Sequence, residues 1–150
     1  MRNPLKIFVP VLVISIIISA CSGKNEAVYE LGKADDCDSA EMICAVSNND
    51  YTAKLKLGPK VTPLQNFPVE LTIANSEGLV HASDVIIDFQ MIGMDMGLNR
   101  YKLNHNDHLW HGNATLPVCV ASRMDWIAIV EFTDQSHRFR AVFPFHTDRN

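Results

Sequence analysis

The alternating pattern of this chain is clearest in Trp126-Ile127-Ala128-Ile129-Val130-Glu131-Phe132. Trp126, Val130 and Phe132 fall on one side of the alternation, and Glu131 falls on the other. Successive side chains of a β-strand point to opposite faces of the sheet, so a period of two predicts a strand with one buried face. We therefore expect this run to be a half-buried strand.

Six further stretches show the same alternation, and turn residues separate them. They lie at residues 51–57, 69–73, 85–90, 101–103, 110–116 and 139–145. Seven short strands without a convincing amphipathic helix predict an all-β fold, an immunoglobulin-like antiparallel β-sandwich of about seven strands. We expect Trp110, Trp126 and the phenylalanines to fill the space between the two sheets.

The length and charge of the chain narrow its functional class. The sequence has 150 residues and a formal net charge of −4. This length suits one domain behind a leader. A nucleic-acid-binding protein would show a basic stripe or patch, so we expect no nucleic-acid partner. We also expect no enzymatic activity, because the sequence has no Gly-x-Ser-x-Gly, Gly-rich phosphate loop or His-Glu-x-x-His motif.

The start of the chain resembles a bacterial lipoprotein leader. Arg2 and Lys6 precede an apolar run at residues 7–18, which is shorter than the roughly 20 apolar residues of a transmembrane helix. Ile18-Ser19-Ala20-Cys21 then matches the lipobox, in which the cysteine is lipidated and becomes the new N-terminus. An uncleaved anchor is the alternative. Ser22 rather than Asp follows the cysteine, and resemblance to Gram-negative lipoproteins then implies the periplasmic face of the outer membrane.

These features divide the chain into three parts. We expect a signal peptide at residues 1–20 and a lipidated polar tether at residues 21–50, where no periodic apolar pattern is present. The sandwich domain then occupies residues 51–150. A lipid on Cys21 would anchor this domain to the membrane without spanning it.

The remaining cysteines lie in an exported chain, and cysteines outside the cytosol tend to pair. Without Cys21 the chain keeps three of them, Cys37, Cys44 and Cys119. Cys37 can close a small loop with Cys44, or Cys44 can tie the start of the domain to Cys119. The sequence leaves both pairings open. One thiol stays unassigned in either case, and Cys119 is that thiol if the small loop forms.

A methionine-rich segment follows the third predicted strand. Three of the six methionines, Met91, Met94 and Met96, fall within six residues, and Gly93 and Gly97 bracket the last two. Thioether sulfur is a soft ligand, so such a cluster in a loop favours Cu(I). Met91 shares the apolar face of the preceding strand and is first of all a core residue, whereas Met94 and Met96 are the primary ligand candidates. The alternative is that these methionines cap the core.

Six histidines offer the other half of a metal site. His105, His108 and His111 recur every three residues after the methionines, and neutral imidazole binds Cu(II) or Zn(II) well. His111 alternates outward from Trp110, so we expect a solvated strand residue. His105 and His108 lie in a turn that either folds back over the methionines, as secondary ligands, or faces water. The other three histidines are isolated and receive no role.

Residues 51–146 resemble the YtkA-like (FixH-related) domain of exported bacterial proteins. The resemblance rests on Met94-Asp95-Met96-Gly97 with Asn99-Arg100, on Trp110-His111-Gly112, and on Leu116-Pro117-Val118-Cys119 and Arg123-Met124-Asp125-Trp126. It implies an immunoglobulin-like sandwich and an association with copper handling or cytochrome oxidase maturation. Met94 and Met96 are the matching candidate ligands, and the histidines are not part of the family motif.

The resulting hypothesis is a lipid-anchored protein that holds one copper ion, as Cu(I), through Met94 and Met96 and exchanges it with a donor or acceptor protein in the periplasm. The alternative is a metal-free immunoglobulin-like interaction or assembly lipoprotein, whose methionines form an apolar patch that faces a partner. A third hypothesis is thiol redox work by Cys37 and Cys44, although six intervening residues replace the Cys-x-x-Cys spacing.

Overall fold

The computed structural model describes residues 27–35, 37, 43–118 and 125–147. In these ranges the chain forms eleven β-strands and no helix. The described part accordingly holds no helix of the length and apolarity that crossing a membrane requires. The strands are β1 (Val28–Lys33), β2 (Ile43–Ser47), β3 (Tyr51–Leu57), β4 (Asn66–Asn75), β5 (Gly78–Leu79), β6 (Ser83–Met91), β7 (Arg100–Lys102), β8 (Asn104–Asn106), β9 (Leu109–Thr115), β10 (Asp125–Asp134) and β11 (His137–His146).

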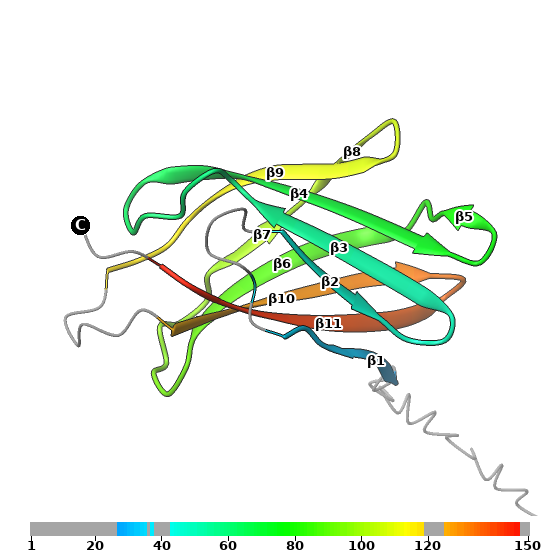
Figure 1. Cartoon of the computed structure of the whole chain (residues 1–150), viewed down its shortest axis with the longest axis horizontal. Helices are drawn as coiled ribbons and strands as arrows, with labels where there is room; N and C mark the ends of the chain where they lie inside the picture. Colours follow the sequence, from blue (N-terminus) through cyan, green and yellow to red (C-terminus); the bar gives the residue numbers. More distant parts are fainter. Residues whose placement is uncertain (1–26, 36, 38–42, 119–124, 148–150) are drawn as a thin grey trace, which may run out of the picture.

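The strands form two sheets that pack as a sandwich (Figure 1). Sheet A has the order β1-β11-β10-β6-β7, and sheet B has the order β2-β3-β4-β9-β8, with β5 also paired to β4. Among the described pairings β1 runs parallel to β11, and the others are antiparallel. This architecture confirms the predicted all-β, immunoglobulin-like class.

The predicted apolar faces line the space between the sheets. Alternate residues of β3, β4, β6 and β10 are buried there, and both tryptophans belong to the same core. Phe89 of β6 is fully buried. Its ring meets those of Phe67, Tyr101 and Phe145 edge to face, at centroid distances of 5.7, 6.1 and 6.1 Å. Phe67 belongs to sheet B, so Phe89 joins the two layers.

Seven of the strands correspond to predicted stretches, and β1, β2, β5 and β8 are additional. Two of these correct the predicted domain boundary. The prediction of a tether across residues 21–50 is wrong for β1 and β2, because β1 pairs with β11 in sheet A and β2 pairs with β3 in sheet B. Leu31 and Val46 contribute to the core. The folded domain therefore includes β1, whereas the predicted signal peptide and Cys21 lie outside the described residues.

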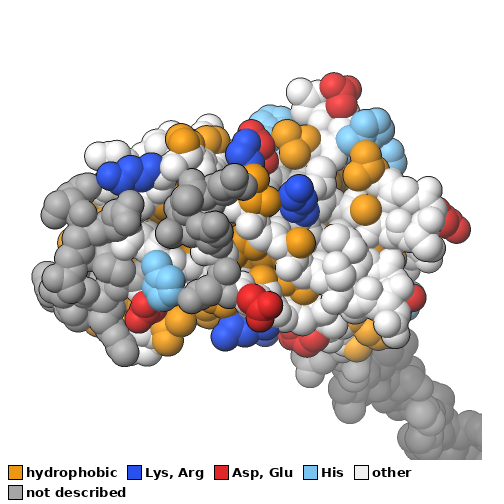
Figure 2. All heavy atoms as spheres, in the orientation of Figure 1, with side chains coloured by type: hydrophobic (Ala, Val, Ile, Leu, Met, Phe, Trp, Pro, Cys, Tyr) orange, Lys and Arg blue, Asp and Glu red, His pale blue; other side chains and the backbone are white. Residues whose placement is uncertain are grey.

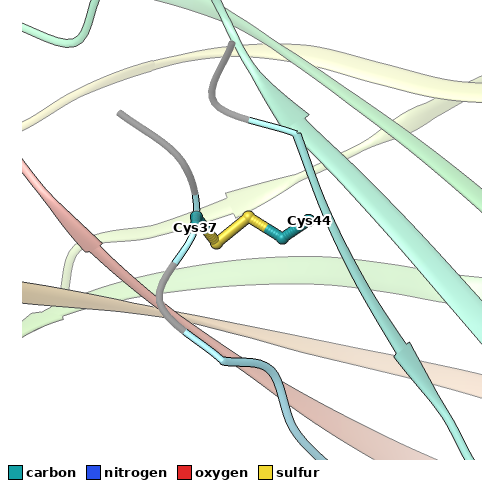
Figure 3. The surroundings of a disulfide bond; sticks show 2 residues. All are labelled: Cys37 and Cys44. Carbon is teal, nitrogen blue, oxygen red and sulfur yellow. A yellow bond between two sulfur atoms is a disulfide. The ribbon is translucent and has the colours of Figure 1, made fainter. Parts of the chain in front are cut away.

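A disulfide between Cys37 and Cys44 joins the two sheets along one edge of the sandwich (Figure 3). Cys37 follows β1, and its amide donates to Pro144 O of β11 at 3.1 Å, whereas Cys44 lies in β2 of sheet B. Both cysteines are buried, and their Cα atoms are 5.2 Å apart. The structure thus contains the small-loop pairing, and the buried position of this bond counts against the thiol redox hypothesis. Cys119 lies outside the described residues.

Tyr51 makes the stability of the sandwich depend on pH in the alkaline range. Its hydroxyl donates to Asp134 Oδ2 at 2.7 Å, which links β3 of sheet B to β10 of sheet A. Burial, followed by the hydrogen bond to the Asp134 carboxylate, raises the pKa of Tyr51 from 10.0 to about 12. Because this pKa is higher in the folded state, Tyr51 contributes to the free energy of unfolding. The contribution is fully present below pH 10 and is lost as the pH rises to about 12.

We expect Tyr51→Phe to weaken this pH dependence, because phenylalanine keeps the ring but has no ionisable hydroxyl. Urea denaturation at several pH values from 9 to about 12 should show a shallower loss of unfolding free energy in the variant than in the wild type. Tyr29→Phe, at an exposed tyrosine of β1, is the control and should follow the wild type. Equal slopes for Tyr51→Phe and the wild type would contradict the assignment.

Candidate metal centre

The loop between β6 and β7 lies at one end of the sandwich, which we call the methionine end (Figure 1). Gly93 and Gly97 have positive φ values of 78° and 71°, which glycine adopts without the steric cost of a Cβ atom. The Met94 amide donates to Met91 O at 3.3 Å, so the chain turns back on the end of β6. The Gly97 amide donates to Asp95 Oδ1 at 2.9 Å, which fixes the second turn.

Contacts on both sides close the base of this loop. The Phe89 amide donates to Asn99 O at 3.0 Å, and Arg100 Nη2 lies 3.4 Å from Asp88 Oδ2. Asp88 is buried, so solvent screens this pair less than an exposed one. The Ile92 amide donates to Asp125 O of β10 at 3.1 Å. The two ends of the loop are therefore fixed on sheet A.

The three methionine side chains border one hollow in the surface. The hollow has a volume of about 340 Å³ and is lined by Gln90, Met91, Gly93, Met94, Asp95, Met96 and Gly97. Met94 and Met96 are half-buried against the core, whereas Asp95 between them is exposed, so the two thioethers lie on the same side of the loop. Met91 is 4% exposed and belongs to the core, yet it also borders the hollow.

The residues around this hollow include three methionines, which offer soft thioether ligands, together with Asp95 and Gln90. The lining contains no histidine or cysteine. Thioether ligands select Cu(I), whereas imidazole-rich sites suit Zn(II) or Cu(II) and oxygen-rich sites suit Mg(II) or Ca(II). The arrangement therefore fits a soft monovalent ion best.

The histidines do not join the methionines. His105 lies in β8 and His108 in the turn of the β8–β9 hairpin, which projects at the other end of the sandwich, here called the hairpin end (Figure 1). β7 begins beside the methionine loop at Arg100 and runs back along β6, and the Leu103 amide then donates to Val85 O near the start of β6. One ion cannot contact both ends of β6. The suggested role of His105 and His108 as secondary ligands of the methionine site is therefore wrong, and both side chains face water.

Two exposed apolar side chains of the loop were not singled out by the sequence patterns. Ile92 is 43% exposed and Leu98 is 89% exposed, and they flank the glycine-bounded methionines. Their position in the sequence could have indicated this exposure. Each apolar residue lies beside a turn glycine and outside any alternating stretch, so no buried strand face is available to it. His111 is exposed on β9, as predicted.

No protein-family model and no curated protein matches this chain. The fold and the site define its class, an immunoglobulin-like β-sandwich that carries a methionine-lined hollow at one end. The function is accordingly inferred from the geometry and chemistry of that hollow.

Proposed function

We propose that this protein is a copper-binding lipoprotein of the bacterial envelope. Met94 and Met96 hold one Cu(I) ion, with Met91 as a third thioether beneath them. The observation that carries the proposal is that three methionines line one open hollow. Cu(I) is the biological ion for which thioether is a preferred ligand.

The proposed role is copper handling, including supply to a maturing cytochrome oxidase, without a reaction of its own. Met94 and Met96 are half-buried, so an ion between them remains within reach of ligands on a second protein. A lipid on Cys21 would hold the protein at the periplasmic face of the outer membrane, beside periplasmic copper donors or acceptors.

One observation favours a second candidate, a metal-free interaction or assembly module. Leu98 is 89% exposed and Ile92 is 43% exposed beside the hollow, which gives this end of the molecule an apolar surface. Exposed apolar patches mark protein–protein contacts. In this alternative the methionines would contribute adaptable contact surface to a protein partner and would bind no ion.

A competitive Cu(I) titration of residues 23–150 tests the proposal. We expect the wild type to bind one ion and the double variant Met94→Ala/Met96→Ala to lose that binding. Leu98→Ala is the matched control, because it removes an exposed loop side chain that does not line the hollow, and it should bind Cu(I) as the wild type does.

Stability measurements separate loss of ligands from loss of fold. Because Met94 and Met96 are half-buried, each truncation should cost less than the roughly 2–5 kcal/mol of a fully buried methionine. A double variant that is folded and binds no Cu(I) supports the proposal. A folded wild type that binds no Cu(I) overturns it and leaves the interaction module as the working function.

A further inference from the structure

Three imidazoles meet at the hairpin end of the sandwich. His81 follows β5, whereas His105 and His108 belong to the β8–β9 hairpin, so two separate segments contribute. The ring centroid of His81 lies 5.2 Å from that of His105 and 5.9 Å from that of His108. All three side chains are exposed, and Figure 2 shows histidine side chains gathered over this hairpin.

The backbone beneath these rings is held in place. His81 lies between Val80 and Ala82, both of which are buried, and the Val80 amide donates to Ile73 O at 2.9 Å. His105 pairs with Trp110 across the hairpin, and its ring packs on the indole at a centroid distance of 4.5 Å. The backbone therefore keeps the three exposed imidazoles close to one another.

We propose that His81, His105 and His108 form a second metal site, which takes Cu(II) or Zn(II). A metal–nitrogen bond of about 2.0–2.1 Å places each ring centroid roughly 3.2 Å from the ion, so two imidazoles on one ion have centroids about 4.5–6.4 Å apart for angles from 90° to 180°. The separations of the His81 ring from those of His105 and His108, 5.2 and 5.9 Å, lie within that interval.

Binding requires the rings to turn. With the side chains as they stand, no group of three His, Cys, Asp or Glu residues in the described part of the chain is arranged to hold a metal ion. Exposed side chains change rotamer within picoseconds to nanoseconds, so the three exposed imidazoles can direct their nitrogens to a common ion.

The imidazole site is chemically distinct from the methionine hollow and does not rest on the proposed function. Imidazole suits Cu(II), Ni(II) and Zn(II), and Cu(II) binds most tightly in the general order of divalent affinities. The hollow at the methionine end has no imidazole in its lining. Each end of the sandwich therefore matches a different kind of ion.

Titration of the full chain, purified in detergent, with Cu(II) alone tests this site. We expect one bound ion with nitrogen hyperfine splitting in its electron paramagnetic resonance spectrum. His81→Ala should raise the dissociation constant at least about tenfold, and His105→Ala/His108→Ala should raise it further. His137→Ala is the control, because His137 is exposed and its ring contacts Tyr29 of β1.

Two further results keep the proposals separate. Met94→Ala/Met96→Ala should leave Cu(II) affinity unchanged, so failure of one site does not imply failure of the other. Paramagnetic broadening of the histidine ring signals in the wild type should be strongest for His81, His105 and His108. An unchanged affinity in His81→Ala, or an equal loss in His137→Ala, would overturn the site.

Discussion

Replacement of Phe89 by alanine should lower the free energy of unfolding by about 4 kcal/mol. Phe89 is fully buried, and its ring contacts Phe67 of sheet B and Phe145 of sheet A edge to face. Loss of the ring leaves a cavity between two close-packed sheets that can refill only if the layers move. Because domains of this kind are stable by only about 5–15 kcal/mol, the variant loses a large part of its stability.

Urea denaturation measures this effect as a lower transition midpoint with an unchanged slope. Phe89→Leu should lose less than Phe89→Ala, because the residual cavity is smaller. Asn113→Ala, at an exposed position of β9, is the control and should change stability by no more than about 0.5 kcal/mol. A loss below about 1 kcal/mol in Phe89→Ala would show that Phe89 does not join the two layers as described.

Loss of the Cys37–Cys44 disulfide should lower the free energy of unfolding by about 2.4 kcal/mol, the chain-entropy value for a closed loop of this size. The bond holds β1, the parallel edge strand of sheet A, to β2, the edge strand of sheet B. Without it the unfolded chain gains freedom, and the two edges lose their covalent link. The variant Cys37→Ala/Cys44→Ala therefore unfolds at lower urea concentration than the oxidised wild type.

Reductant provides the matched control for this prediction. The reduced wild type should approach the stability of Cys37→Ala/Cys44→Ala, and reductant should not alter the variant. Because the variant keeps Cys119, a reductant effect that persists in it would trace to that thiol. Equal stability of the oxidised wild type and the variant would contradict a stabilising role for the bond.

The sequence predicted those strands whose buried faces alternate over several residues. Examples are β3 (Tyr51–Leu57) and β6 (Ser83–Met91). In β1 only Leu31 is buried, and in β8 no residue is buried. Neither strand therefore shows an alternation of buried and exposed residues. β5 has two residues, too few for any period. β2 does alternate at Cys44 and Val46, but its polar surroundings resembled a tether.

The candidate site shows the same limit. The glycines around Met94 and Met96 indicated a loop, and a loop is present, because positive φ values at glycine are a local property. The pairing of strands decides which distant segments meet. His81 therefore looked isolated in the sequence, although the fold brings it beside His105. The separation of His105 from the methionines likewise results from pairing, because β7 and Leu103 run back along β6 toward its start.

The start of β1 lies at the hairpin end, because Val28 pairs with Arg138 at the beginning of β11. With the proposed lipid on Cys21, the intervening segment can extend no more than about 25 Å, so this end stays near the bilayer. The methionine hollow then lies a further strand length away, about 30 Å for the nine residues of β6. The proposed attachment point and the proposed soft ligands would therefore lie at opposite ends of the domain, so a second protein could approach the hollow from the side away from the anchor.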